Sequence, residues 1–150
     1  MNTLKKLTTI FFSLIVIISC SKNNESSNSG DCATLCEYTI ASGETAGTAA
    51  SSLDGSYNLT MHHADAASPF PDGTKAKFTI NNNVLTVEID GKECITIKNP
   101  VLTTAGSTEV KFKDTCRDKI TYDVSENNGK LNEINISDLN GKWLGQFNDR

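Results

Sequence analysis

The chain has 150 residues, of which 37% are hydrophobic and 21% charged, and it carries 14 lysines and arginines against 18 aspartates and glutamates. This length provides for one domain, and the apolar content suffices for a buried core, so wholesale disorder is excluded. Without the first nineteen residues, which hold Lys5, Lys6 and no acid, 12 basic side chains stand against 18 acidic ones, a net charge of −6. Nucleic acid is therefore not an expected partner, because phosphate binding needs clustered cations.

The N-terminus has the layout of a secretory signal peptide. Two lysines precede a mostly apolar run from Leu7 to Ser19, which Cys20 follows. As a helix, this run would span only about two thirds of the roughly 30 Å hydrocarbon core of a bilayer. We therefore expect residues 1–19 to be a removable signal peptide.

The cleavage zone, Ile17-Ile18-Ser19-Cys20, resembles the lipobox of bacterial lipoproteins. The resemblance implies that Cys20 is acylated and begins the mature chain. Ser21, in place of the aspartate of a retention signal, implies sorting to the outer membrane, with the domain on either face of it. Ile18 departs from the family, which usually has a small residue there. The alternative is an ordinary secretory signal with a coincidental cysteine.

Residues 20–30 are the lipidated cysteine and an expected flexible tether, because Ser21 to Gly30 contain no apolar side chain whose burial could offset the entropy of ordering. Residues 31–150 are the expected single all-β domain.

Four cysteines follow the tether: Cys32, Cys36, Cys94 and Cys116. An even number in an exported chain indicates disulfide bonds. Of the three connectivities we favour Cys32–Cys36 with Cys94–Cys116, because each bond joins segments that the predicted strands keep close. The alternatives are a zinc site or a redox pair, but both usually place two residues between neighbouring cysteines, and Cys32 and Cys36 have three. No metal and no cofactor is expected.

Beyond Leu53 the apolar residues alternate with a period of two, which is typical of half-buried strands. Turn signals such as Asp90-Gly91 and Asn128-Gly129 separate the alternating runs. The pattern predicts eight strands: 57–61, 75–80, 84–89, 93–98, 108–114, 119–124, 131–136 and 142–147. For residues 31–52 we expect a pinned segment, either a short helical turn or an edge strand.

Alternation also assigns the faces of these strands. The side expected to face inward holds Tyr57, Leu59, Met61, Ala76, Phe78, Ile80, Leu85, Val87, Ile89, Ile95, Ile97, Val110, Phe112, Ile120, Tyr122, Val124, Ile134, Ile136, Trp143 and Phe147. Short connections require antiparallel neighbours, so the strands form a meander. It must close as a small barrel or fold over as a two-sheet sandwich, since an open sheet would leave apolar surface and edges exposed. A barrel would place the first and last strands side by side.

In strand count and order the domain looks like a lipocalin-type (calycin) barrel, and Gly55-x-Tyr57 is similar to that superfamily's Gly-x-Trp opening. Tyr57 stands where the family has Trp. The resemblance implies a barrel and transfers no ligand.

The chain contains no nucleophile elbow, phosphate loop or dinucleotide fingerprint, so an enzyme is not expected. His62 and His63 are adjacent, and neighbours in a regular strand project to opposite faces. His63 and Asp65 could form half a metal site, but a solvated strand end is the favoured interpretation. Residues 123–133 suggest a calcium loop, yet the glycine and the acid are out of register for an EF-hand, and a hairpin is favoured.

The connection from His62 to Thr74 is long, and Pro69-Phe70-Pro71 stiffens it. Phe70 is either a contact residue in a lid or finger, or a plug at the end of the core, and we favour the plug. The segment 99–107, with Val101 and Leu102, has the same two interpretations.

The leading hypothesis is a lipid-anchored outer-membrane lipoprotein whose non-enzymatic β-domain binds a protein, glycan or envelope component. The alternative is a lipocalin-like carrier of a small apolar ligand. It ranks second because an eight-stranded barrel is narrow enough to be filled by its own side chains. The candidate contacts with a ligand or partner are Phe70, Tyr57 and Trp143.

Overall fold

The computed structural model describes residues 32–150, so the predicted signal peptide, the lipidation at Cys20 and the tether lie outside the described residues. The expectation of an all-β domain is confirmed, because ten strands form one sheet in which every pairing but one is antiparallel. No helix in the described part is long and apolar enough to span a membrane.

The elements run in the order β1 (Thr34–Glu37), the 3₁₀ turn η1 (Ser51–Leu53), β2 (Gly55–Ala64), β3 (Lys75–Asn81), β4 (Val84–Ile89), β5 (Ile95–Lys98), β6 (Val101–Leu102), β7 (Val110–Lys113), β8 (Ile120–Asn127), β9 (Lys130–Asp138) and β10 (Leu144–Asn148). Each of the eight predicted strands corresponds to one of these. The two further strands, β1 and β6, are short and form the two edges of the sheet.

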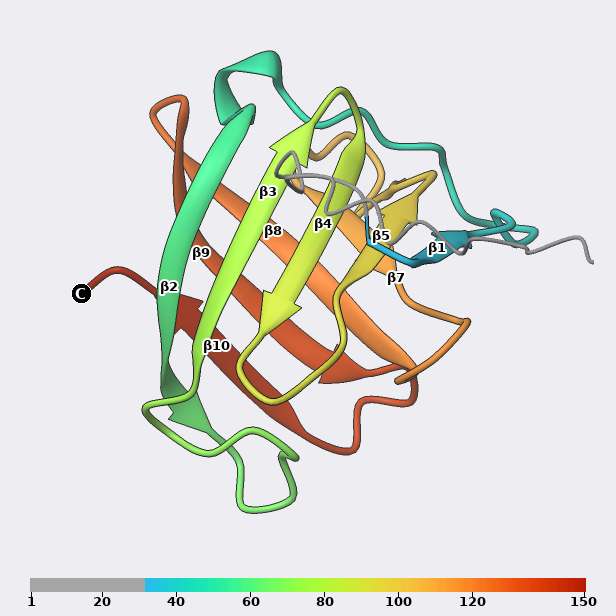
Figure 1. Ribbon diagram of the computed structural model, residues 1–150. Coiled ribbons are helices and arrows are strands. Elements are labelled where there is room, and N and C mark those ends of the chain that lie inside the picture. Colours follow the sequence, from blue (N-terminus) through green and yellow to red (C-terminus); the bar gives the residue numbers. More distant parts are fainter. Residues whose placement is uncertain (1–31) are drawn as a thin grey trace, which may run out of the picture.

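The sheet has the order β1-β5-β4-β3-β2-β10-β9-β8-β7-β6 and curls into a half-barrel (Figure 1). β2 pairs with β10, so the first and last strands of the meander are neighbours, as the barrel prediction required. The sheet is open between its two edge strands, β1, which pairs with β5, and β6, which pairs with β7. We call this opening the seam. Ala46, in the segment between β1 and η1, forms an isolated bridge to Val101 of β6.

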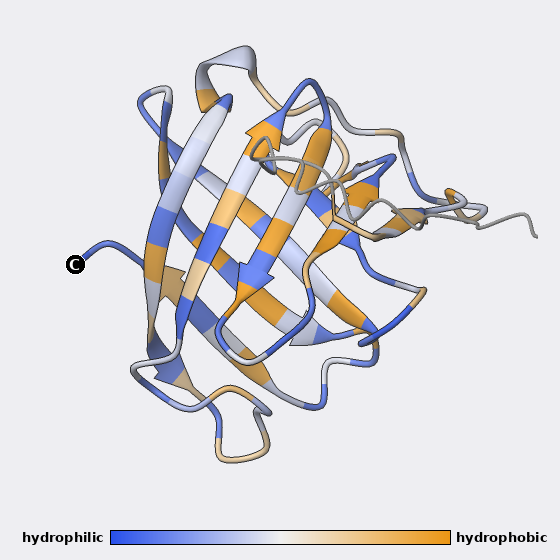
Figure 2. Ribbon diagram, in the orientation of Figure 1, coloured by the Kyte–Doolittle hydropathy of each residue, from blue (hydrophilic) through white to orange (hydrophobic). Residues whose placement is uncertain are grey.

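The alternation of side chains follows the prediction closely (Figure 2). Every residue assigned to the inner face is buried except Tyr57 and Trp143, which are half-buried. Two hairpins have two-residue loops, Asn82-Asn83 and Asn128-Gly129, with positive φ at both positions. This is the type I′ geometry whose twist matches that of the strands it joins.

The interior is filled by aromatic side chains. Phe78 lies edge-on to Tyr122 and to Phe147, with ring centroids 6.3 and 5.2 Å apart. Leu53 of η1 is 2% exposed, and Phe70 of the loop after β2 is 3% exposed. These two side chains pack onto the core from opposite ends of β2. Phe70 is therefore a plug, as favoured, and not an exposed finger.

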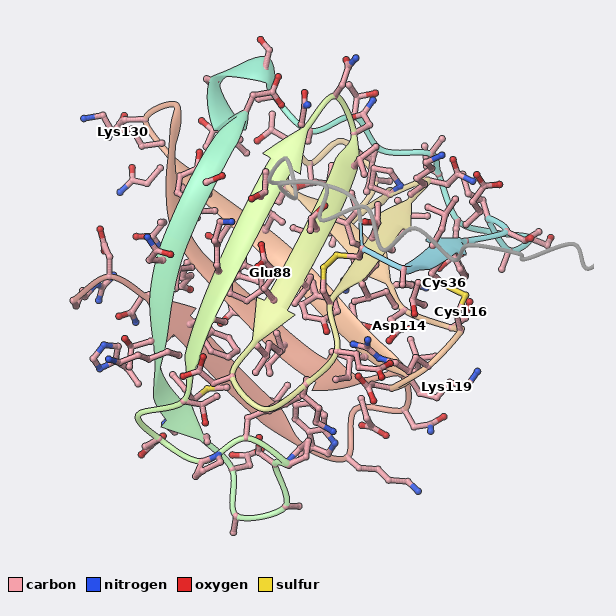
Figure 3. All side chains as sticks on the ribbon, viewed as in Figure 1. Cys36, Glu88, Asp114, Cys116, Lys119 and Lys130 are labelled. Atoms are coloured by element: carbon pink, nitrogen blue, oxygen red, sulfur yellow. A yellow bond between two sulfur atoms is a disulfide. The ribbon has the colours of Figure 1, made fainter. Side chains whose placement is uncertain are left out.

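The predicted disulfide pairing is wrong. The bonds are Cys32–Cys94 and Cys36–Cys116, with Cα atoms 5.2 and 5.8 Å apart (Figure 3). The reason is that β1 is extended along β5, with Thr34 opposite Ile95 and Cys36 opposite Ile97. Thr34 to Cys36 already covers about 7 Å, and Cys32 lies two residues further back, so these two cysteines are beyond the reach of a disulfide.

Candidate functional site

The three candidate contact residues do not form one site. Phe70 and Trp143 meet edge-to-face at one end of the half-barrel, with ring centroids 6.3 Å apart, and the Lys92 ammonium lies 5.8 Å from the Phe70 ring. Tyr57 lies at the other end, where its hydroxyl donates to the carbonyl of Leu53 at 2.8 Å. Burial, with the Asp54 charge, raises the pKa of Tyr57, so its hydroxyl stays a donor. Its role here is to hold η1 in place.

The two histidines lie on the part of β2 that pairs with β10. A bulge shifts the register between Gln146 opposite His63 and Phe147 opposite Met61, and it leaves both His62 and His63 exposed. Both histidines are therefore in solvent at the end of β2, in agreement with the favoured solvated strand end. His63 Nε2 lies 4.0 Å from Asp65 Oδ1, and both side chains are largely in solvent.

The described residues contain one cluster of three potential metal ligands, Cys36, Asp114 and Cys116. Its two sulfurs are bonded to each other. Both Asp114 oxygens already accept hydrogen bonds from the backbone N–H groups of residues 116, 117 and 118, at 2.8–2.9 Å. The cluster is therefore a structural turn. Residues 123–133 form the β8–β9 hairpin, as favoured over a calcium loop.

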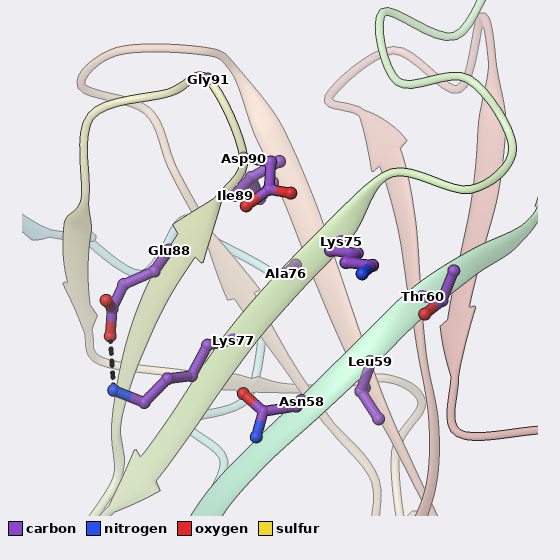
Figure 4. Close-up of a pocket in the computed structure, with 10 residues that line it drawn as sticks. All are labelled: Asn58, Leu59, Thr60, Lys75, Ala76, Lys77, Glu88, Ile89, Asp90 and Gly91. Atoms are coloured by element: carbon purple, nitrogen blue, oxygen red, sulfur yellow. Dashed lines mark hydrogen bonds and ion pairs between the residues drawn. The ribbon is translucent and has the colours of Figure 1, made fainter.

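A shallow hollow of about 630 Å³ lies on the outer face of β2, β3 and β4 (Figure 4). We call it the outer hollow. Its outward side chains form two cross-strand rows. In the first row Lys77 lies between Asn58 and Glu88. In the second row Thr60 lies opposite Lys75. The carbonyl of Lys75 accepts a hydrogen bond from the backbone N–H of Asp90, which completes this row.

The charges of the outer hollow are only partly paired. Lys77 Nζ lies 2.9 Å from Glu88 Oε1. Lys75 and Asp90 are exposed and form no ion pair within residues 32–150. The hollow thus presents an ammonium, a carboxylate, an amide and a hydroxyl to solvent, which together donate and accept hydrogen bonds.

A chain of side-chain hydrogen bonds adjoins the outer hollow on the β9–β10 side. Asn135 donates to Glu133, Gln146 donates to Asn135, and Asn148 donates to Gln146, at 3.1–3.2 Å. We call these four residues the amide chain. Asn148 lies opposite Thr60 but is only 3% exposed, so the amide chain meets the strand that lines the hollow through a buried side chain. The other three members, Glu133, Asn135 and Gln146, are half-buried.

The sequence did not reveal this surface. Alternation assigned Lys75, Lys77 and Glu88 to the solvent side but could not group them with Asn58 and Thr60. The β3–β4 register could be read from the Asn82-Asn83 turn. The β2–β3 register depends on the long connection between Ala64 and Lys75, whose length gives no register.

The seam is covered by a second polar cluster, the Glu44 clamp, made of Tyr38, Glu44 and Lys113. The Tyr38 hydroxyl donates to Glu44 Oε2 at 2.6 Å, Lys113 forms an ion pair with Glu44, and the Lys113 ammonium lies 5.0 Å from the Tyr38 ring centroid. Hydrogen bonds from Lys113 and Tyr38 lower the pKa of Glu44 to about 2. The clamp fastens residues 38–44 onto β7, and its carboxylate stays ionised at neutral pH.

Comparison with known proteins finds no matching family model, no matching curated protein and no matching solved structure. The functional argument therefore rests on the residues of this chain.

Proposed function

We propose that this protein is a lipid-anchored outer-membrane lipoprotein whose β-domain binds a component of the cell envelope, a glycan or a protein, on its outer surface. The proposal assigns no reaction to the domain. The anchor is supported by the resemblance of Ile17 to Cys20 to a lipobox. The binding role is supported by the polar side chains that line the outer hollow.

The proposal depends on the location of the outer hollow, which lies on the outside of the half-barrel. The interior is occupied by Phe78, Phe112, Tyr122 and Phe147, all fully buried, so binding is expected outside the half-barrel. The neutral amide of Asn58 and the hydroxyl of Thr60 match the hydroxyls of a sugar, and the unpaired Lys75 and Asp90 would orient a charged substituent. A glycan is therefore the favoured ligand.

The anchor is tested by labelling cells with a clickable palmitate analogue. The full-length protein should be labelled, and a Cys20→Ser variant should not. An unlabelled wild-type protein would contradict the anchor and leave the binding proposal to its own test.

The binding surface is tested on an array of envelope glycans, peptidoglycan fragments included, with the Cys20→Ser chain. Lys75→Ala and Asp90→Ala should each weaken binding at least tenfold. Lys130→Ala, which removes an exposed lysine at the distant β8–β9 hairpin, is the matched control and should bind normally. An equal loss in Lys130→Ala would indicate general charge attraction and would contradict the proposed surface.

The carrier of a small apolar ligand remains the second proposal. Such a ligand would have to displace Phe70, which touches Trp143, the only tryptophan. A saturable change in tryptophan emission on adding a fatty acid or haem would favour this function over surface binding.

A further inference from the structure

The two disulfide bonds interleave along the chain. In order of sequence the four bonded cysteines are 32, 36, 94 and 116, and the bonds join the first of them to the third and the second to the fourth. The bonded residues are 62 and 80 positions apart, whereas Cys32 and Cys36 are only four positions apart.

An unfolded chain favours the wrong bonds. The probability that two residues meet falls roughly as the three-halves power of their separation, so Cys32 meets Cys36 on the order of tens of times more often than it meets Cys94. For the same reason Cys116 meets Cys94, 22 positions away, about sevenfold more often than Cys36. Undirected oxidation therefore yields Cys32–Cys36 and Cys94–Cys116.

The wrong bonds are incompatible with the folded domain. β1 holds Cys32 beside the β4–β5 loop and Cys36 beside the loop after β7, too far apart to bond to each other. A chain with the Cys32–Cys36 bond cannot extend β1 along β5. Cys36, which is fully buried in the native domain, would then leave the core. The chain must exchange these bonds before the seam can close.

We propose that this protein is a substrate of a thiol–disulfide isomerase, a role that goes beyond the proposed function and does not rest on it. The isomerase thiolate attacks the Cys36 sulfur of the Cys32–Cys36 bond, which releases Cys32 as a thiolate and leaves Cys36 in a mixed disulfide. The Cys32 thiolate attacks Cys94 in the Cys94–Cys116 bond, which forms Cys32–Cys94 and releases the Cys116 thiolate.

The last exchange regenerates the enzyme. The Cys116 thiolate attacks Cys36 in the mixed disulfide, so the Cys36–Cys116 bond forms and the isomerase thiolate leaves. The protein holds two disulfides before and after, so no electrons are transferred overall and no oxidant is consumed.

The test uses the full chain with Cys20→Ser, so that four cysteines remain. The reduced, unfolded protein is returned to native buffer with stoichiometric diamide and no free thiol, and its bonds are mapped by proteolysis under non-reducing conditions. We expect Cys32–Cys36 in most molecules. A catalytic amount of reduced protein disulfide isomerase should then restore the native bonds at least tenfold faster than the same concentration of glutathione. Native bonds formed directly in full yield, or an isomerase no better than glutathione, would overturn the proposal.

Two variants provide the control. Cys32→Ser with Cys94→Ser leaves only Cys36 and Cys116, and Cys36→Ser with Cys116→Ser leaves only Cys32 and Cys94. Each has a single bond to form, so the isomerase should not change the yield of either. An equal acceleration in both variants would show that the enzyme assists folding rather than exchange, and would also overturn the proposal.

Discussion

At Gly47, beside β6, there is no room for a side chain. A Cβ atom there would lie 2.8 Å from the carbonyl carbon of Val101 and 2.9 Å from its oxygen, closer than such atoms approach. The Gly47 N–H also donates to the carbonyl of Pro100 at 2.8 Å. The missing side chain lets residues 45–47 lie directly on β6.

Gly47→Ala should therefore lower the free energy of unfolding by about 1–3 kcal/mol, the usual effect of forcing a methyl group into packed atoms. Urea unfolding followed by circular dichroism measures the change. Gly55→Ala is the control, because its Cβ would make only ordinary contacts, at 3.4 Å or more. Equal losses in the two variants would contradict the close contact at Gly47.

Tyr122 carries a buried polar atom that forms no hydrogen bond with the described residues. Its side chain is fully buried, and its hydroxyl has no hydrogen-bond partner among residues 32–150. Burial raises the pKa of this phenol, so it is protonated at any physiological pH.

Tyr122→Phe should leave the free energy of unfolding unchanged or raise it by up to about 1 kcal/mol, because an unpaired hydroxyl no longer has to be desolvated. Tyr122→Ala should cost about 3–5 kcal/mol through the cavity that it leaves. Thermal unfolding of both variants tests this. A Phe variant destabilised by more than about 1 kcal/mol would indicate that the hydroxyl has a partner.

At the scale of elements, the two edge strands β1 and β6 do not pair with each other, and the Glu44 clamp joins the segment after β1 to β7 instead. The folded-state pKa of Glu44 is lowered from 4.5 to about 2. A carboxyl group with a lowered pKa contributes stability above its unfolded pKa and loses it as the pH falls through the folded value. The contribution is therefore complete above about pH 5 and is lost progressively between about pH 5 and pH 1.

Glu44→Gln should lower the stability at pH 7 by about 1 kcal/mol, a figure reduced from the full shift because the pair is partly solvated. At pH 2, where most of the contribution is lost, the variant and the wild type should unfold at nearly the same denaturant concentration. Denaturant titrations at pH 7, 4 and 2 measure both quantities. A difference that persists undiminished at pH 2 would mean that the carboxylate charge is not the cause.

The strands show which parts of the fold could be predicted from the sequence. Period-two alternation and the Asn and Gly turns predicted the eight strands of the meander and their inner faces, because both signals are local. β6 was missed because two residues cannot show a period. β5 was expected to begin at Glu93 but begins at Ile95. Arg117 Nη1 binds the carbonyls of Glu93 and Cys94, and Cys94 is bonded to Cys32, so residues from distant parts of the chain hold this stretch in a loop.

At the scale of the whole molecule, the half-barrel is completed by covalent bonds. Both disulfides attach the N-terminal segment to the domain, and one of them crosses the seam to the loop after β7. Neither the seam nor the pairing was predictable, because both depend on β1 lying parallel to β5, a pairing that no turn signal specifies. The outer hollow was not predictable either, because it depends on the register between β2 and β3, which a long loop connects.

Removing either disulfide should lower the melting temperature, because each closes a long loop whose entropy the unfolded chain regains. The Cys36→Ser/Cys116→Ser variant should lose about 2–4 kcal/mol. It should lose more than Cys32→Ser/Cys94→Ser, since it also removes a fully buried side chain and opens the seam. Calorimetry of the two double variants tests this order, and the reverse order would show that the seam is held by other contacts.

The Cys32–Cys94 bond has a mechanical consequence. If the chain is anchored through Cys20, a pulling force between the membrane and a bound ligand would act on the domain first at Cys32. From there the load passes through the sulfur bridge into the loop that joins β4 and β5. The four paired residues of β1, which would otherwise be peeled off one by one, are shielded from that pull. If the chain is anchored through Cys20, the disulfide would therefore transfer load to the β4–β5 loop rather than along the edge strand β1.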